Sequence, residues 1–434
     1  MKFIAQSYHI LVGLFVVSLP TSKAANSITL GLLCVVSFII LLKKHQPTRW
    51  FVPALWPVLF FLLYIPSLAV SEDLTQGLWF LYRQVIYLAL PVSLYLCRAF
   101  WMPHIHQYFK WFIISNAAAS VITLIFFALP EPTVVTITDT IPGLMDYVQM
   151  SSRIKFGLYS PFIDRLHFAY LLGMSLLCLI YFFSRGHRAE WQVFSTITIS
   201  ITFLLLGGRG AQLGLLFGAV IWISWYSGQY LSGQYPHYSL LQRRLIQQFI
   251  VLVYLITVPL LVYNVLGPVK TRYQQLFWEL KLIQNGDYRN WDYQHFTSLR
   301  RLLSVKHHLT LIRENFMFGT GIGDFRKDLK TAYAADHSMG IQIDPNANNK
   351  FLFILANTGL LGLIIFLGTL FGIAKQIYIT PDMPLRHLAF AFSIFIVVSW
   401  LFDIFTVYQV GASFFCFFVT LFLLHPTSES QASV

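Results

Sequence analysis

Charged side chains are scarce in this chain of 434 residues, where Asp, Glu, Lys and Arg together make up only 11%. A soluble globular domain carries about 25% of such residues. Because apolar residues reach 56%, the composition excludes both a soluble single-core enzyme and an intrinsically disordered chain. The apolar residues form continuous runs rather than the short alternating strands of a membrane β-barrel. We therefore predict an all-α polytopic membrane protein.

Cysteine is also rare, and its spacing fits neither a metal site nor a disulfide framework. All four copies lie within or at the end of apolar runs, so we interpret them as small residues facing lipid or the protein core. They are Cys34, Cys97, Cys178 and Cys416. The net charge is +12, but in a membrane protein the positions of the basic residues matter more than their sum. We expect no nucleic-acid partner.

Twelve apolar runs are long enough to cross a hydrocarbon core of about 30 Å. With the N-terminus in the cytoplasm, the short inner segments hold most of the Lys and Arg residues, such as Lys43, Lys44 and Arg49. The short outer turns hold little beyond Lys23. This positive-inside pattern predicts an even number of spans with both termini inside. The predicted spans are 3–20, 27–42, 50–70, 76–97, 107–130, 166–184, 191–207, 210–226, 246–266, 350–374, 386–402 and 404–425.

Two outer segments are too long to be turns, at about 131–165 and about 267–349. The second is the only extended polar region, and a loop of this length in a compact protein is commonly functional. We therefore divide the chain into three parts. Residues 1–266 hold nine spans, 267–349 form a large outer loop with amphipathic helices and the candidate active site, and 350–434 hold three spans and a cytoplasmic tail.

Arg209 is the first candidate site residue. It lies between two predicted spans at the outer face, flanked by Gly208 and Gly210. The glycines allow a ligand to approach the backbone closely, and the guanidinium offers a planar fork to phosphate. The alternative is an interfacial arginine that extends to lipid headgroups.

Arg301, with Arg300 beside it, is the second candidate. Residues 296–313 predict an amphipathic helix, with Leu299, Leu302, Leu303, Leu309 and Ile312 at helical spacing. His308 follows Arg301 by seven residues and therefore shares its face of the helix. A helix lying along the membrane surface would direct these groups at a headgroup, although a plain interfacial helix explains the same pattern.

A polar stretch precedes the span that begins at residue 350. His337 lies in it and is a candidate general base, because histidine titrates near neutral pH. Asn348 and Asn349 follow just before the span, where we expect them to contact substrate or to cap the next helix. The alternative for His337 is an ordinary surface histidine.

Three further charged positions lie near the membrane. Arg165 and His167 stand at the outer mouth of the sixth span, as candidate substrate-binding residues or as headgroup anchors. Arg83 lies about two turns inside the fourth span, where an arginine is costly and by default functional. Asp403 lies between the last two spans as a possible partner for one of these groups. The sequence has no metal-binding motif, P-loop or nucleotide fold, so we expect no cofactor and a metal-free site built on arginines.

Three of these segments resemble the O-antigen ligase and polymerase family. In that family an arginine opens an amphipathic helix that ends in a glycine-rich turn, as in the block from Arg301 to Gly323, where Phe316 replaces the usual proline. The segment around Arg209 resembles the family's short Ser-Arg-Gly segment. The stretch from Asn348 to Gly362 resembles its segment of the form HN-x-x-L…A-x-x-G-L-x-G. The matched motifs cover roughly residues 200–370, in the family's order and spacing.

One position departs from the family pattern. The family histidine falls at Asn348, and an amide cannot act as a general base. The nearest histidine is His337, eleven residues earlier. Either His337 takes over that role or the site works without a histidine at this place.

The resemblance implies a GT-C type membrane glycosyltransferase, active on the periplasmic side of the bacterial inner membrane. Such enzymes move a glycan from undecaprenyl pyrophosphate to an acceptor, with inversion, and membrane lipids and these two substrates are the partners expected. Ligases use lipid A-core as the acceptor, polymerases use another lipid-linked repeat unit, and related enzymes use protein hydroxyls. We expect Arg209 and Arg301 to clamp the pyrophosphate, Arg165 to assist, and His337 to handle the acceptor proton. A monomer is compatible with this chemistry.

Two readings from other classes remain. A transporter or flippase for a lipid-linked glycan predicts charged residues deep in several spans and paired broken helices near the midplane. Here the polar residues gather at the outer mouth and in one outer loop, which favours surface chemistry. A non-catalytic membrane scaffold predicts that Arg209 and Arg301 both tolerate replacement by alanine.

Overall fold

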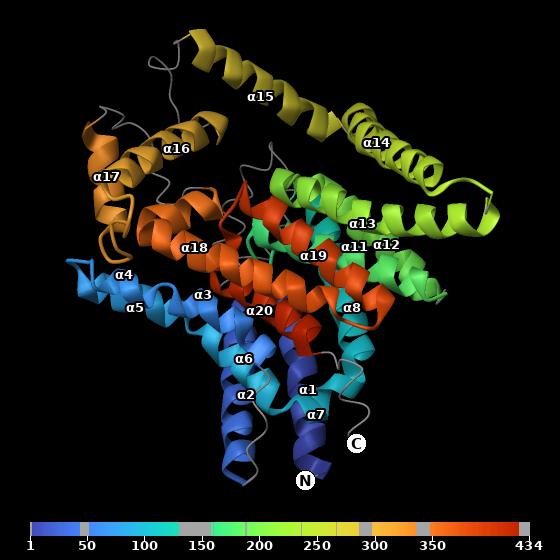
Figure 1. Ribbon diagram of the computed structural model, residues 1–434, viewed down its shortest axis with the longest axis horizontal. Helices are drawn as coiled ribbons and strands as arrows, with labels where there is room; N and C mark the ends of the chain where they lie inside the picture. Colours follow the sequence, from blue (N-terminus) through green and yellow to red (C-terminus); the bar gives the residue numbers. More distant parts are fainter. Residues whose placement is uncertain are drawn as a thin grey trace.

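The computed structural model describes residues 2–43, 52–129, 158, 160–186, 189–235, 237–265, 267–285, 297–335 and 348–424. Within these ranges every regular element is a helix and there is no strand, which confirms the all-α membrane protein (Figure 1). The first half contains α1 (Lys2–Ser18), α2 (Lys23–Lys43), η1 (Val52–Val58), α3 (Leu59–Leu62), α4 (Ile65–Leu68), α5 (Leu74–Gln84), α6 (Ile86–Leu96), α7 (Arg98–Trp101), η2 (Met102–His104), α8 (Ile105–Ala128), α11 (Arg165–Ser184) and α12 (Glu190–Leu206). The second half contains α13 (Arg209–Gln234), α14 (Leu240–Val265), α15 (Gly267–Asn285), α16 (Thr297–Glu314), α17 (Phe325–Ala335), α18 (Lys350–Tyr378), α19 (Met383–Trp400), η6 (Phe405–Val407) and α20 (Gln409–Leu424).

The described residues contain eight helical stretches that are long and apolar enough to cross a membrane. Four further apolar helices, at 6–18, 55–68, 190–206 and 409–424, are shorter. Each of the twelve predicted runs is therefore helical, and a multi-pass membrane protein is confirmed, whereas twelve full-length spans are not. The eight stretches are Lys23–Leu42, Leu74–Leu96, Arg98–Ala128, Arg165–Ser184, Arg209–Gln234, Leu240–Asn264, Lys350–Tyr378 and Met383–Trp400.

Proline explains why the run at 50–70 is not the continuous span that the sequence predicts. The structure divides this run into η1, α3 and α4. Pro57 lies inside η1, and Pro66 lies at the start of α4. Proline has no N–H and fixes φ, so it interrupts helical hydrogen bonding and lets each piece change direction.

The core of the bundle is built around α20, which is buried from Val410 to Leu424. Its aromatic rings pack against those of neighbouring helices. The rings of Phe418 and Phe112 are 5.0 Å apart, and those of Phe414 and Phe392 are 5.7 Å apart. Edge-to-face packing of this kind supplies van der Waals contact where lipid offers no hydrophobic driving force.

Helices α13 and α19 approach closely because glycines recur every fourth residue on one face of α13. A Cβ atom added at Gly214 would lie 2.6 Å from the carbonyl oxygen of Phe395, and one at Gly218 would lie 2.8 Å from that of Ala391. Small residues at this spacing are the usual means by which membrane helices pack backbone to backbone. The start of α13, which carries Arg209, is thereby held against α19.

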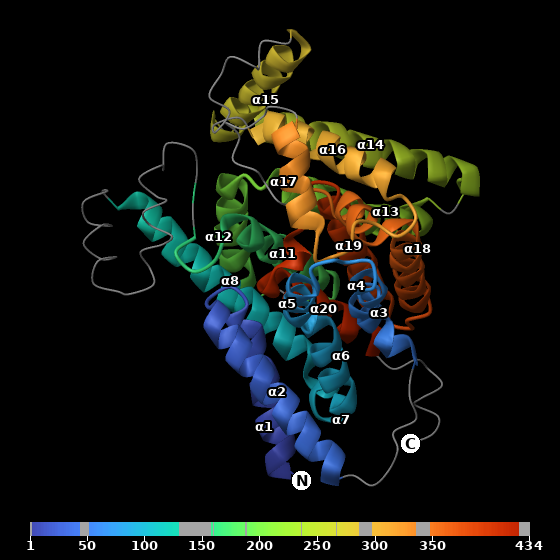
Figure 2. The same ribbon diagram turned by 90° about the vertical axis from the view of Figure 1, so that its left-hand side faces the viewer.

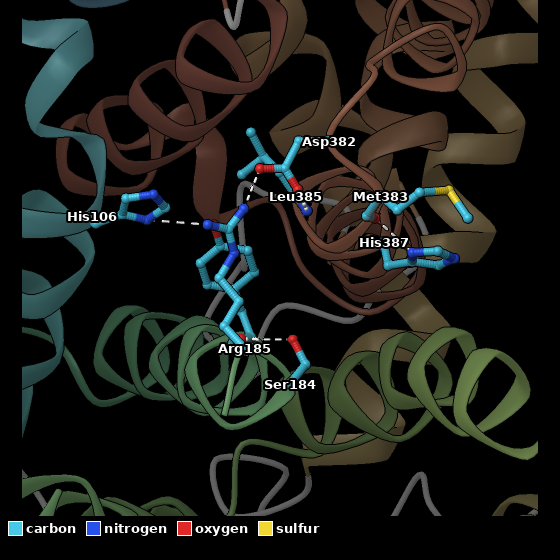
Figure 3. A network of polar contacts seen from close by, with 8 residues as sticks. His106, Ser184, Arg185, Asp382, Met383, Leu385 and His387 are labelled. Carbon is cyan, nitrogen blue, oxygen red and sulfur yellow. Dashed lines mark hydrogen bonds and ion pairs between the residues drawn. The ribbon is translucent and has the colours of Figure 1, made fainter. Parts of the chain in front are cut away.

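An ion pair joins α11 to α19 at the ends of these helices that lie far from the candidate site. Arg185, just after α11, pairs with Asp382, which also caps α19 by accepting a hydrogen bond from the Leu385 N–H at 3.2 Å (Figure 3). The Arg185 guanidinium lies 5.1 Å from the centre of the Tyr181 ring. The pair fixes the relative height of the two helices whose other ends form the site.

The predicted outer loop contains three helices. Figures 1 and 2 show α14 and α15 on one side of the molecule, with α1 and α2 reaching furthest on the opposite side. Helix α16 packs against α17 and α18, and α15 contacts α14 and α16. The predicted loop is therefore largely helical in its described part.

The glycine-rich turn between α16 and α17 docks onto an interruption of α18. Gly359 breaks α18, with φ 66° and ψ −167°. The break leaves backbone groups that the turn satisfies: Thr320 N–H donates to the Ala356 carbonyl at 2.9 Å, and Gly321 N–H donates to the Asn357 carbonyl at 3.1 Å. This turn therefore fixes α16, and with it Arg301, relative to the spans.

The same turn is locked to the connection before α5. The buried Asp324 accepts hydrogen bonds from the backbone N–H groups of Glu72 and Asp73, at 2.5 and 3.0 Å. A Cβ atom at Gly323 would lie 2.1 Å from the Asp73 carbonyl oxygen, so only glycine allows this approach. The result places α17 beside α5 (Figure 1).

Candidate functional site

A polar cluster forms where α11 begins, where α19 joins α20 and where α16 begins. Asp403, in the α19–α20 connection, is 8% exposed. One of its carboxylate oxygens accepts a hydrogen bond from the Ile404 N–H at 2.6 Å, and the other accepts one from the Tyr170 hydroxyl at 3.2 Å. Arg301, half-buried at the start of the second turn of α16, lies close enough for its charge to act on both Asp403 and Tyr170.

His167 and Asp164 complete this group, which we call the Arg301–Asp403 cluster (Asp164, His167, Tyr170, Arg301 and Asp403). Asp164 caps α11 by accepting a hydrogen bond from the Leu166 N–H at 2.8 Å, and its carboxylate lies 3.4 Å from His167 Nδ1. Burial alone would raise the pKa of Asp164, but the hydrogen bonds and the charge of His167 hold it at about 2. This carboxyl is therefore ionised at every physiological pH.

Asp403 has the opposite electrostatic character. Burial raises the pKa of its carboxyl, while the neighbouring charges of His167 and Arg301 and the hydrogen bonds of Ile404 and Tyr170 counteract the rise. A partly desolvated carboxylate is a strong hydrogen-bond acceptor. It is chemically suited to orient a hydroxyl group or to take up its proton.

Arg209 begins α13 next to this cluster. Gly207 ends α12 with a left-handed φ of 63°, and Gly208 is the first residue outside α13. A Cβ atom at Gly210 would lie 3.0 Å from the Tyr170 hydroxyl oxygen and 3.2 Å from the Phe402 Cβ. The glycines around Arg209 thus make room for neighbouring protein groups. From the sequence alone, we expect them to make room for a ligand. Tyr170 therefore lies against the start of α13 and within range of the charge of Arg301.

Of the two asparagines before α18, Asn349 contacts the α19–α20 connection. Asn349 caps α18, because its side-chain oxygen accepts from the Phe351 and Leu352 N–H groups at 2.9 and 3.0 Å. Its amide N–H donates to the Leu401 carbonyl at 3.3 Å, two residues before Asp403. Asn348 has a φ of 45°, which few non-glycine residues adopt. Asn348, which stands where the related family has a histidine, is therefore the neighbour in sequence of a residue that contacts the connection carrying Asp403.

Helix α16 buries only part of the predicted leucine stripe, because Leu303 and Ile312 are buried. Leu302 and Leu309 are exposed, whereas His307 and His308 are buried. The reason is that α16 packs on α17 through aromatic contacts: the ring of His308 lies 5.3 Å from that of Phe325. His308 Nδ1 also lies 2.6 Å from the Ser304 carbonyl.

The remaining predicted residues fall into two groups. Arg165 is half-buried as the first residue of α11, next to the Arg301–Asp403 cluster. Arg83 lies in the last turn of α5 with its guanidinium 4.8 Å from the centre of the Trp79 ring, and it lines a different hollow, described below. Arg300 lies in α16, but its side chain is outside the described part, and His337 lies outside the described residues altogether.

Sequence reasoning missed Tyr170 and gave Asp403 only a possible partner role. A usable signal was present, because Tyr170 lies three residues after His167 and therefore on the same face of α11. For Asp403, the signal was a single carboxylate between two apolar runs. Neither signal indicates that the two residues meet.

Comparison with known proteins agrees with the motifs. The family model of O-antigen ligase matches residues 194–367, a segment that includes Arg209, Arg301 and both asparagines. No curated protein matches the chain. Between residues 194 and 367, this membrane protein carries a domain of the O-antigen ligase family, whose members are glycosyltransferase-like enzymes of ligase or polymerase type.

Proposed function

We propose that this protein transfers a glycan from undecaprenyl pyrophosphate to a sugar of lipid A-core, at the periplasmic face of a bacterial inner membrane, within a GT-C type architecture. The observation that carries the proposal is the position of Tyr170, whose hydroxyl donates to the buried Asp403, lies against the start of α13 and is within range of the charge of Arg301. Two of these elements lie in the segment that matches the O-antigen ligase family.

The arginines suit the leaving group of this reaction. As the glycosidic bond breaks, the pyrophosphate takes the bonding electrons and its negative charge grows. Guanidinium groups at Arg301 and Arg209 stabilise that charge by charge-assisted hydrogen bonds and need no metal. Arg165, one turn before Tyr170 on α11, is placed to assist.

An apolar cavity near Arg209 suits the lipid part of the donor. It has a volume of about 280 Å³ and lies between α11, α12, α13 and α14. Gln212 and Leu213 line it, within four residues of Arg209, and Tyr254 and Pro259 of α14 line it from the other side. A polyprenyl chain in this cavity would place its pyrophosphate at the start of α13.

The acceptor hydroxyl must lose a proton when its oxygen attacks the anomeric carbon. The new oxygen–carbon bond forms on the face opposite the breaking bond to pyrophosphate, so the anomeric configuration inverts. We assign the proton to the Asp403 carboxylate, because the family histidine is replaced by Asn348 and the charge of Arg301 acts on Asp403. His337 is the alternative from the sequence. Transfer lost in Asp403→Asn but kept in His337→Ala supports the assignment to Asp403, and the reverse pattern contradicts it.

The experiment that tests the proposed function measures glycan transfer by the purified protein in detergent. The donor is undecaprenyl-pyrophosphate-linked glycan, the acceptor is lipid A-core, and excess EDTA is present. Glycosylated lipid A-core is the expected product. Growth of the glycan on the donor lipid alone would show a polymerase, and transfer only to an added protein acceptor would show a protein-targeting ligase. No product from folded protein with any acceptor would contradict the enzyme proposal and favour a transporter.

A further inference from the structure

A second hollow lies between α5 and α17, separate from the Arg301–Asp403 cluster. Its volume is about 520 Å³. Among the described residues that line it, four are basic and Asp73 alone is acidic. The four are Arg83, Arg326, Lys327 and Lys330. We call it the α5–α17 groove.

The charge of the groove is available to a ligand. Arg326 and Lys330 project from exposed positions of α17. Lys327 lies 4.0 Å from Glu72, but both side chains are largely exposed, and such a surface pair contributes little. Asp73 already uses one side-chain oxygen to cap α5, accepting from the Gln76 N–H at 3.0 Å. The groove therefore carries a net positive charge that favours an anion.

Aromatic rings form the rest of the wall. Trp79 and Phe80 come from α5, Phe353 from α18, and Tyr408 from the connection before α20. Flat aromatic faces beside cations suit a ligand that combines apolar C–H faces with a negative charge. A phosphorylated sugar ring has both features, whereas a bare phosphate has only the charge.

The groove adjoins the reaction centre through one side chain. The ring of Tyr408 lies edge-on to that of His167, with centroids 5.3 Å apart, and His167 belongs to the Arg301–Asp403 cluster. A ligand in the groove can therefore reach the cluster past Tyr408. The position of the wall is fixed, because Asp324 and Gly323 lock α17 to the connection before α5.

We propose that the α5–α17 groove binds a phosphate-bearing saccharide, with Arg326 and Lys330 on the phosphate and Trp79 and Tyr408 on the sugar ring. The inference rests on the proposed function, in which such a saccharide is the acceptor glycan. It assigns the acceptor to α5 and α17 and leaves Arg301 and Arg209 to the donor pyrophosphate. It also specifies the acceptor class, namely a glycan that carries phosphate near the sugar to be modified.

The first test measures binding without transfer. Saturation-transfer NMR would follow glucose 6-phosphate, with glucose as the phosphate-free control, on the full-length protein in nanodiscs of phosphatidylcholine. The double variant Arg326→Ala/Lys330→Ala is expected to weaken binding of the sugar phosphate at least about tenfold, because each removed cation takes away a charged hydrogen bond. The control Arg313→Ala removes an exposed cation of α16 outside the groove and is expected to change nothing. Two results would overturn the proposal. One is the same affinity of the Arg326→Ala/Lys330→Ala and Arg313→Ala variants for glucose 6-phosphate, and the other is the same affinity of the wild type for glucose and glucose 6-phosphate.

Two further arms separate the sources of the phosphate and the two proposals. If phosphatidylglycerol in the nanodiscs displaces the sugar phosphate from the wild type, the groove holds a lipid headgroup and the saccharide assignment fails. Arg301→Ala is expected to retain binding of glucose 6-phosphate while losing transfer. A wild type that binds glucose 6-phosphate but transfers no glycan would refute the proposed function and leave the groove's ligand class standing.

The second test uses kinetics of transfer. The groove variant is expected to raise KM for a phosphorylated acceptor about tenfold with kcat and the donor KM unchanged, and to have no effect with the dephosphorylated acceptor. An equal effect on both acceptors would overturn the role of the phosphate. Thermal unfolding of the variants serves as the folding control.

Discussion

The interruption of α18 at Gly359 is expected to be indispensable for holding α16 in place. Its backbone has φ 66° and ψ −167°, a region that only glycine adopts readily. A Cβ atom there would lie 2.3 Å from the Met317 carbonyl oxygen, so the glycine-rich turn must move if the residue becomes alanine. The perturbation Gly359→Ala therefore strains the helix and displaces the turn together.

The loss of stability in Gly359→Ala follows from the backbone strain it introduces and the hydrogen bonds it breaks. The backbone strain costs about 1–3 kcal/mol. Displacing the turn endangers three hydrogen bonds between 2.9 and 3.1 Å, those from Thr320 to Ala356, from Gly321 to Asn357 and from Leu360 to Phe316, each worth about 1 kcal/mol. Together the change is expected to lower the free energy of unfolding by on the order of 4 kcal/mol.

The assay compares Gly359→Ala with Gly368→Ala on the same helix. A Cβ atom at Gly368 meets nothing within 4 Å, so this control is expected to be neutral or to stabilise by up to about 1 kcal/mol through helix propensity. Thermal unfolding of both variants and the wild type is followed by tryptophan fluorescence in one detergent at one scan rate, since membrane proteins commonly unfold irreversibly. If both variants unfold at the wild-type temperature, the reasoning about the turn is refuted.

Substitutions at three other positions test the electrostatics. Asp403→Asn is expected to change the free energy of unfolding by less than about 1 kcal/mol, because the amide oxygen can still accept from the Ile404 N–H and the amide NH2 can donate to the Tyr170 hydroxyl, which reverses that bond. Asp403→Ala leaves two buried donors unpaired and is expected to cost about 2–4 kcal/mol in denaturation assays. Asp164→Asn keeps the helix cap but removes the charge. Since the folded-state pKa of Asp164 is lowered to about 2, the wild type is expected to be more stable than this variant above about pH 4, and this difference disappears as the pH falls through about 2. A difference in the free energy of unfolding that grows on acidification would contradict this. Arg185→Ala breaks the partly exposed pair with Asp382, and a double-mutant cycle is expected to give a coupling of only about 0.5–1 kcal/mol; a value above about 3 kcal/mol would show that exposure does not weaken the pair.

Much of the fold is readable from the sequence because hydropathy is a local property. Each predicted apolar run is a helix in the structure, and the polar segment before residue 350 carries α15, α16 and α17. The errors have local causes as well. Pro57 and Pro66 divide one run, and helices shorter than a bilayer are indistinguishable from spans when only their composition is read.

The site is less readable because it depends on contacts between distant residues. The hydrogen bond from Tyr170 to Asp403 joins residues 233 apart, and those from Glu72 and Asp73 to Asp324 span more than 250. Hydrophobic periodicity carries no information about such pairs. The sequence singles out Arg209 and Arg301 because arginine in a glycine-flanked turn and on an amphipathic helix stands out by composition, whereas Tyr170 resembles any other aromatic residue of a span.

The role of the glycines shows how a correct motif can be explained wrongly. The sequence suggested that Gly208 and Gly210 make room for a ligand. The structure shows that they make room for Ala169 and Tyr170 of α11. The motif therefore preserves the packing that positions Arg209, and the chemistry follows from that packing.

In the proposed mechanism Arg301 stabilises the leaving pyrophosphate without a metal. This role can be measured as kcat/KM for glycan transfer in excess EDTA for the wild type, Arg301→Ala and Arg313→Ala, two variants that each remove one arginine from α16. We expect kcat/KM to fall about 10²–10³-fold for Arg301→Ala, as for the loss of one group that stabilises charge in a transition state, and to change within about twofold for Arg313→Ala. Equal activity of the two variants, or loss of wild-type transfer in EDTA, would contradict it.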